Sequence, residues 1–170
     1  MSTSHPRFTV QIEGSPETIF DLIADMPNYG RWLSGSEVFG GTTEVSPYPV
    51  RLGTTYLDAG PAGQRPGSVT GYAPPKYIAF HHTMLLKRGP ITANIDVHIR
   101  YTLERLENAT GVIRDLDLTI QMPGPLKAAE PLVVWAFRKE NVRILAELKR
   151  YVEGQPKQCD REKAYTESKQ

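Results

Sequence analysis

Two adjacent histidines, His81 and His82, are the first residues to which the sequence assigns a chemical role. Neighbouring side chains on a strand point to opposite faces, and the alternate residues Ile78 and Phe80 are apolar. We therefore expect His82 to face inward and His81 outward. A neutral imidazole at His82 suits general acid–base catalysis near neutral pH, and a buried histidine bonded to a backbone carbonyl is the alternative. No other ligand residue is spaced to join the pair, so no metal site is predicted.

Three more polar residues interrupt apolar patterns. Tyr101 lies on the apolar face of its strand, Arg114 shares the parity of its apolar neighbours, and Asn141 falls within the apolar stripe of a helix. Facing inward, they would orient a substrate carbonyl and stabilise an enolate or carboxylate. The alternatives are core packing for Tyr101, a head group extended into solvent for Arg114, and a structural hydrogen bond for Asn141.

Tyr56 and Asp58 share one face of a short predicted strand. On a concave face they would form a polar cluster suited to proton transfer, and on a convex face they would be exposed. The alternation is too short to decide between the two, and we expect the exposed alternative. Trp32, Phe80 and Phe137 are expected either to form cavity walls or to pack in the core.

Other classes of function lack support in the sequence. A net charge of +1 provides no general attraction to nucleic acid. There is no nucleophile motif, phosphate loop or dinucleotide fingerprint, so no cofactor is expected. Cys159 is the single cysteine. No apolar run resembles a signal peptide or a membrane span, so we expect a cytoplasmic protein without membrane insertion. The oligomeric state, including a homodimer, stays open.

The elements that would position these residues follow from periodicity. Residues 8–12 alternate as a strand, and Ser15-Pro16 then starts a helix with apolar residues at helical spacing. Pro27 ends it, and residues 29–33 form a second short helix. The antiparallel strands are predicted at 37–45, 54–59, 67–72, 77–85, 91–106 and 112–121. Residues 126–153 form a long amphipathic helix.

Three segments resemble a known superfamily. They are Ser15 to Asp25 with Tyr29 and Trp32, the stretch from Val69 to Phe80 with its Pro74-Pro75 pair, and the amphipathic C-terminal helix. This chain resembles the START-like or Bet v 1-like (SRPBCC) superfamily, and within it the polyketide cyclase/dehydrase and lipid-transport group. Gly71 departs from the acidic residue of many relatives. The interrupted loop 60–67 makes the plant hormone-binding branch less favoured.

The resemblance implies an α+β helix-grip fold. A curved antiparallel sheet of about seven strands would wrap around the long C-terminal helix, with a short helix pair after the first strand. The predicted domain covers residues 7–154, and residues 155–170 are expected to be a disordered tail.

The resemblance also implies a ligand, an apolar small molecule held in a cavity between sheet and helix. The first functional hypothesis is cofactor-independent cyclisation, dehydration or isomerisation, with His82 as acid or base. Tyr101, Arg114 and Asn141 would then orient the substrate. The alternatives are a non-catalytic carrier or sensor of a lipid, isoprenoid or aromatic metabolite, and an interaction protein resembling a co-chaperone or assembly factor.

Overall fold

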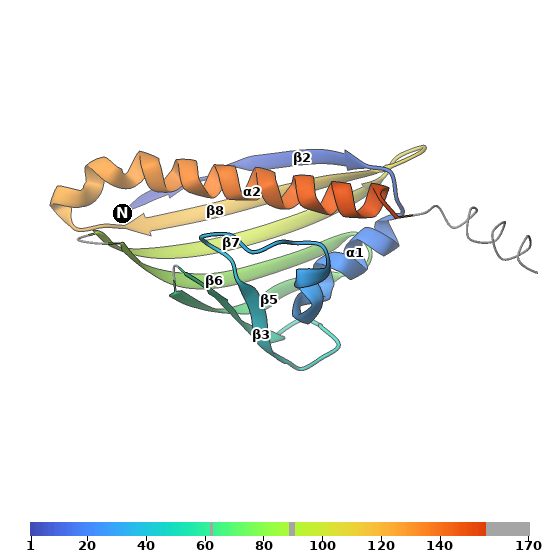
Figure 1. The fold of residues 1–170 in the computed structure, drawn as a ribbon, viewed down its shortest axis with the longest axis horizontal. Helices are drawn as coiled ribbons and strands as arrows, with labels where there is room; N and C mark the ends of the chain where they lie inside the picture. Colours follow the sequence, from blue (N-terminus) through green and yellow to red (C-terminus); the bar gives the residue numbers. More distant parts are fainter. Residues whose placement is uncertain (62, 89–90, 156–170) are drawn as a thin grey trace, which may run out of the picture.

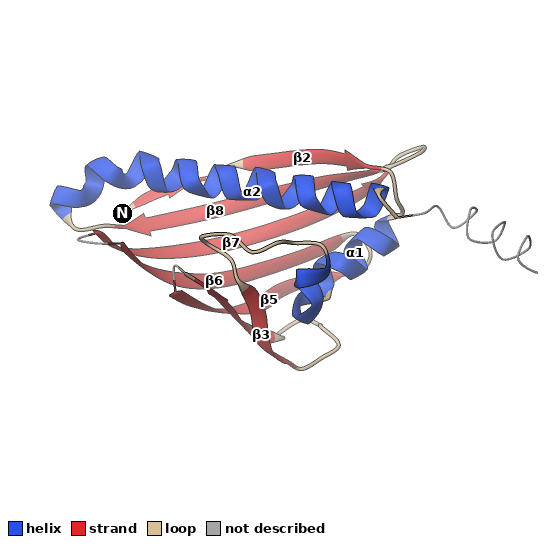
Figure 2. Cartoon of the chain, in the orientation of Figure 1, coloured by secondary structure: helices blue, strands red, loops and turns tan. Residues whose placement is uncertain are grey.

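The protein is an α+β structure in which one long helix lies on one face of a curved antiparallel sheet (Figures 1 and 2). The computed structural model describes residues 1–61, 63–88 and 91–155. Almost all of the predicted C-terminal tail lies outside the described residues. Among the described residues, no helix combines the length and apolar character needed to cross a bilayer.

The described residues form eight strands and four helical segments. In chain order they are β1 (Ser2–Ser4), β2 (Arg7–Ile12), α1 (Pro16–Ala24), the 3-10 helix η1 (Met26–Arg31), β3 (Gly41–Ser46), β4 (Thr55–Gly60), β5 (Gly63–Ala73), β6 (Tyr77–Arg88), β7 (Ile91–Arg105), β8 (Thr110–Gln121), the 3-10 helix η2 (Gly124–Ala129) and α2 (Glu130–Glu153).

The sheet has the order β1-β8-β7-β6-β5-β4-β3, and β2 also pairs with β8. Strands β3 to β8 therefore follow one another as antiparallel neighbours, as the absence of helical patterns between them predicted. The two N-terminal strands share one edge, because both pair with β8: Ser2 is opposite Ile120 and Arg7 is opposite Asp115. Every second residue of β8 is buried along its length, as expected for a strand with one covered face.

Helix α1 begins where the sequence predicted. The Ser15 hydroxyl accepts a hydrogen bond from the Thr18 amide at 3.2 Å, and Pro16 occupies the first turn. The helix ends at Ala24, and η1 follows at once. The second short helix was predicted at 29–33, but it starts earlier and is a 3-10 helix.

Three boundaries differ from the sequence prediction for local reasons. Strand β3 starts at Gly41 instead of 37, because the Ser36 hydroxyl accepts from the amides of Val38 and Phe39 and forms a turn there. Strand β5 starts at Gly63 instead of 67, because its first residues pair with β4. The α-helical part of the last helix starts at Glu130, after the 3-10 segment η2. The short strand β1 was not predicted.

The C-terminal half of α2 is fixed against β2 by polar and steric contacts. Lys149 Nζ donates to the carbonyl of Gln11 at 2.7 Å, and Glu153 Oε1 accepts from the Glu13 amide at 3.1 Å. At Gly14, an added Cβ would lie 2.7 Å from Val152. This close approach explains a glycine between β2 and α1, because a side chain there would push the helix away.

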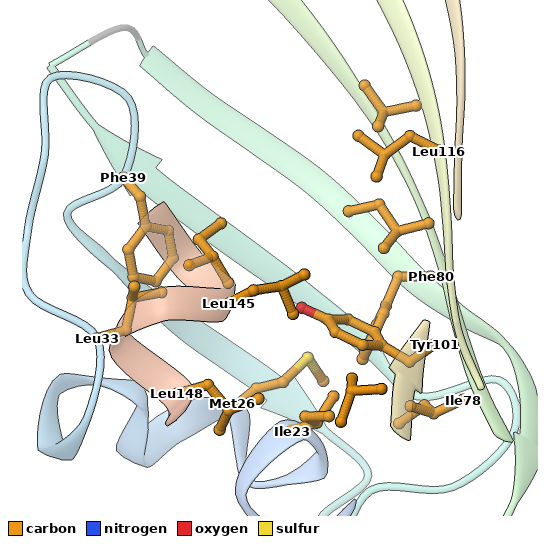
Figure 3. Packing of buried hydrophobic residues seen from close by; sticks show 14 of the residues in the cluster. Ile23, Met26, Leu33, Phe39, Ile78, Phe80, Tyr101, Leu116, Leu145 and Leu148 are labelled. Carbon is orange, nitrogen blue, oxygen red and sulfur yellow. The ribbon is translucent and has the colours of Figure 1, made fainter. Parts of the chain in front are cut away.

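The core lies between α2 and the concave face of the sheet. Figure 3 shows helical and sheet residues converging there; among those labelled are Met26, Leu145, Leu148, Phe80, Tyr101 and Leu116. The buried stripe on α2 predicted from the sequence is present at Asn141, Ile144, Leu145 and Leu148, whereas Val134 and Phe137 are partly exposed.

Replacement of Leu148 tests whether this helix–sheet contact holds the fold together. Leu148 is fully buried, so Leu148→Ala leaves a cavity and should lower the free energy of unfolding by about 2–5 kcal/mol. Val142→Ala on the exposed side of the same helix is the matched control and should change it by less than about 0.5 kcal/mol. Urea denaturation measures both; equal effects of the two substitutions would contradict the described orientation of α2.

Candidate functional site

A pocket of about 950 Å³ lies between the sheet and α2. Its walls come from the concave face of β4 to β8, from one side of α2, and from η1 with the segment that follows it. Most of the lining side chains are apolar or aromatic, including Met26, Leu33, Phe39, Met84, Val97, Ile99 and Ile144. Such a surface is suited to an apolar molecule, with a few polar groups deciding its orientation.

All nine residues singled out from the sequence line this pocket. They are Trp32, Tyr56, Asp58, Phe80, His82, Tyr101, Arg114, Phe137 and Asn141. The preference for an exposed Tyr56 and Asp58 was wrong. Tyr56 is 5% exposed, and both side chains point to the concave face, because β4 is covered on that side by the core.

His82 faces the pocket and His81 faces outward, as the alternation predicted. The Tyr56 hydroxyl lies 3.5 Å from His82 Nδ1, so the neighbour of the buried imidazole is a side chain, where the alternative interpretation had a backbone carbonyl. Burial lowers the pKa of His82 to about 3, and the charges of Arg65 and Arg114 contribute to the shift. His82 is therefore neutral at pH 7.

Gly67 allows the Tyr56 ring to approach His82. Gly67 of β5 is the register partner of Tyr56 on β4 and of His82 on β6, so the three residues form one row across the sheet. A Cβ at position 67 would lie 2.5 Å from the Tyr56 ring. A side chain at this position would displace the tyrosine from the histidine.

Two buried arginines are the main electrostatic feature of the pocket. Arg65 and Arg114 are each 6% exposed, and both line the pocket. Nε of each, and Nη2 of Arg65, are buried without a hydrogen-bond partner among the described residues. The Arg114 guanidinium carbon lies 4.7 Å from the centre of the Tyr101 ring. Burial lowers the pKa of Arg114 to about 10, so it stays charged at pH 7.

Arg65 was missed by the sequence analysis. The segment 60–67 was interpreted as a loop because of its glycines and prolines, and no facing could be assigned within a loop. Its pairing with β4 makes it a strand, in which Arg65 is opposite Asp58. Alternation within the hairpin formed by β4 and β5 was the signal that could have identified it.

Asp58 is a carboxylate that lines the pocket with these arginines and is opposite Arg65 in the sheet. Its Oδ1 accepts a hydrogen bond from the Thr42 hydroxyl at 2.5 Å. Burial raises the pKa of Asp58, while the Thr42 hydrogen bond and the charges of Arg65 and Arg114 oppose that shift. The result is a carboxyl group with a raised pKa that is held in one position, and such a group can exchange a proton with a bound molecule.

Asn141 presents an unpaired acceptor to the pocket. Its Nδ2 donates to the carbonyl of Phe137, one turn earlier on α2, at 2.7 Å. Its Oδ1 is buried and has no partner among the described residues. Half of the amide is therefore used within the helix, and the other half can accept a hydrogen bond from a ligand.

The segment after η1 is attached to α2 by a group of ionic hydrogen bonds. The Ser34 amide and hydroxyl donate to Glu147, and Arg143 donates to the Ser34 carbonyl at 3.0 Å. The Ser36 hydroxyl donates to Glu140 at 2.9 Å, and Arg143 also pairs with Glu140 at 2.7 Å. These contacts fix one wall of the pocket between the helix and η1.

Trp32 belongs to the same wall. Its Nε1 donates to the carbonyl of Leu22 at 3.3 Å, and its ring meets that of Tyr29 edge to face. No set of three histidine, cysteine or acidic side chains at metal-binding distances lies in the pocket, as far as the described residues go. On the convex face, His81, Asp96 and His98 do approach one another.

The pH dependence of stability tests the environment of His82. Its pKa in the folded protein lies below the ordinary value of 6.5, so the unfolded chain takes up the proton first as the pH falls. Stability should therefore be lost below about pH 6.5, by at most about 1.4 kcal/mol per pH unit. His82→Asn cannot titrate, and its unfolding free energy should fall by about 2 kcal/mol less than that of the wild type between pH 7 and pH 5. Parallel urea-denaturation profiles for the two proteins would show that His82 is not held neutral.

No family model and no curated protein sequence matches the chain. Solved structures do match. The di-domain ARO/CYC BexL from the BE-7585A biosynthetic pathway superposes with a TM-score of 0.66 at 13% identity, over 91% of this chain and 51% of BexL. DynU16, a putative protein of the dynemicin biosynthetic locus, gives 0.59 at 19% identity, over 89% of this chain and 48% of DynU16.

A third structure has about the length of this chain. The Aha1 dimer from Colwellia psychrerythraea matches with a TM-score of 0.55 at 20% identity, over 88% of this chain and 96% of that one. The chain spans about half the length of BexL and DynU16. At these low identities the likeness concerns the fold: the chain has the helix-grip fold that the resemblance predicted.

Proposed function

We propose that the protein binds an apolar, polyketide-like small molecule in the pocket and catalyses its cyclisation, dehydration or isomerisation without a cofactor. The observation that carries this proposal is the presence of two buried arginines, Arg65 and Arg114, and of Asp58 in a pocket whose other walls are largely apolar. Unpaired guanidinium N–H groups in such a place favour an oxygen atom that carries, or acquires, negative charge.

The pocket supports binding through two kinds of contact. Apolar and aromatic walls gain free energy when the carbon skeleton of a ligand leaves water. Arg65 and Arg114 then select the end of the ligand that bears oxygen, because hydrogen bonds to charged donors are stronger than those to neutral donors. Asn141 Oδ1 provides an acceptor for a hydroxyl group elsewhere on the ligand.

The chemistry begins with proton removal next to a carbonyl group. Asp58 accepts the proton from carbon, and the electron pair moves to the carbonyl oxygen, giving an enolate. Arg114 or Arg65 stabilises that oxyanion in a site shielded from water. The enolate carbon then attacks a second carbonyl of the same folded molecule and closes a ring, and the alkoxide that forms takes the proton back from Asp58. Elimination of water from the resulting alcohol completes a dehydration.

Asp58 is a better proton acceptor than His82 in this scheme. A base works well when its pKa lies near the operating pH, and the pKa of His82 at about 3 is far below it. Burial raises the pKa of Asp58, which moves it in the useful direction. His82 and Tyr56 then act as neutral hydrogen-bonding groups that hold the carbonyl oxygen and the new hydroxyl.

The comparisons support the same direction without specifying a substrate. BexL is described as a di-domain ARO/CYC, and DynU16 comes from a biosynthetic locus. The carrier hypothesis uses the same pocket and differs by the absence of proton transfer. The interaction-protein hypothesis predicts a small or closed cavity, and a pocket of about 950 Å³ argues for a ligand.

Paired fluorescent probes test whether the arginines select an anion. The probes are 8-anilinonaphthalene-1-sulfonate and its neutral relative N-phenyl-1-naphthylamine, titrated into the protein. Arg114→Gln should weaken binding of the sulfonate by roughly tenfold or more and leave the neutral probe within a factor of about two. Arg105→Gln, an exposed arginine on β7, is the control. Equal losses for both probes, with the fold intact by circular dichroism, would mean that Arg114 only supports packing.

Deuterium exchange separates the enzyme from the carrier. With an α-deuterated aryl 1,3-diketone as the probe, the protein should accelerate loss of deuterium to water, as followed by NMR. Asp58→Asn should reduce this acceleration by about a hundredfold or more while the diketone still binds. His82→Asn should retain most of it. Tight binding with no exchange above the buffer rate would support the carrier and refute the enzyme.

A further inference from the structure

The convex face of the sheet, opposite the pocket, carries a cluster of three ligand-type side chains. His81 of β6 and His98 of β7 are register partners, and their rings stack with centroids 4.2 Å apart. Asp96 lies two residues before His98 on the same strand and therefore on the same face. Sequence spacing alone gave no sign of this group, because its members come together through the pairing of two strands.

The carboxylate of Asp96 bridges the Nε2 atoms of the two imidazoles. Its Oδ1 is 2.7 Å from His81 Nε2, and its Oδ2 is 3.2 Å from His98 Nε2. The three ligand atoms all lie within 4.8 Å of one another. Two metal bonds of about 2.1 Å at a tetrahedral angle place their ligand atoms about 3.4 Å apart. The two distances from the Asp96 oxygens to the imidazole nitrogens are close to that spacing.

The neighbours of the cluster leave these ligands available. Asp117 of β8 is the register partner of His98, but its carboxylate is bound by Arg100 and by His5. Thr83 and Thr119 are the partners of Asp96 on the two adjacent strands, and neither carries a charge. Ser68 is opposite His81. No lysine or arginine is recorded in an ion pair with Asp96 among the described residues.

We propose that His81, Asp96 and His98 bind a divalent transition metal of the zinc or copper class, with solvent completing its coordination. Two imidazole nitrogens and one carboxylate oxygen are ligands that such ions prefer over calcium or magnesium. The backbone of the site is held rigidly, since β6 and β7 pair without interruption from Tyr77–Thr102 to Arg88–Ile91. The site does not depend on the proposed function, because it lies on the other face of the sheet.

Metal titration of the tag-free protein tests this proposal. At pH 7.5, isothermal titration calorimetry with zinc chloride should give one ion per chain and a Kd on the order of 10 µM. His81→Ala and His98→Ala should each weaken binding by at least roughly tenfold. His5→Ala removes another histidine of the convex face and is the matched control, with an unchanged Kd.

Two further readouts keep the test independent of a single variant. Electron paramagnetic resonance of bound Cu²⁺ should show two coupled nitrogens in the wild type and one in each single histidine variant. Excess zinc should raise the wild-type Tm by about 5 °C and leave the Tm of the His81→Ala/His98→Ala double variant unchanged. Absence of binding at millimolar zinc, or wild-type affinity in the double variant, would overturn the proposal. Loss of binding in His5→Ala would also overturn it.

Discussion

The structure depends on one constraint: a single 24-residue helix must cover the concave face of an eight-stranded sheet. Alternation along β6 to β8 makes that face apolar, so it must be shielded from water. Helix α2 is fixed to β2 at its C-terminal half by Lys149 and Glu153. The part of the face that α2 does not reach is covered by α1, by η1 and by the segment bound to Glu140, Arg143 and Glu147. The pocket lies between the sheet, α2 and η1 with this segment.

The polar groups inside this pocket work against stability. Placing Arg65 and Arg114 away from water costs free energy, and Nε of each and Nη2 of Arg65 have no hydrogen-bond partner among the described residues. The fold tolerates this cost because a large apolar core surrounds the group. Unsatisfied buried charge in one corner of an otherwise apolar pocket is the kind of local conflict that marks a functional site. Burial keeps His82 neutral, and the same charges add to that effect.

Strands β6 and β7 place different functional side chains on the two faces of the sheet. His81 and His82 are adjacent in sequence, yet one stacks on His98 at the convex surface and the other lies beside Tyr56 in the pocket. The sheet separates them by pointing consecutive side chains in opposite directions. Three of the four histidines, His5, His81 and His98, belong to the convex face, where Asp96 and Asp117 accompany them.

By itself, the sequence determined most of the elements and the inward facing of His82 and Asn141, because these follow from local periodicity of two or 3.6 residues. The helix-grip fold was implied by the resemblance, and the facing of Arg114 was left open. It did not determine the facing of Tyr56 and Asp58, whose strand is too short for its alternation to be decisive. Arg65 and the group around Asp96 required the tertiary structure. Their neighbours lie on other strands, and the register between strands is set by which faces the folded chain buries.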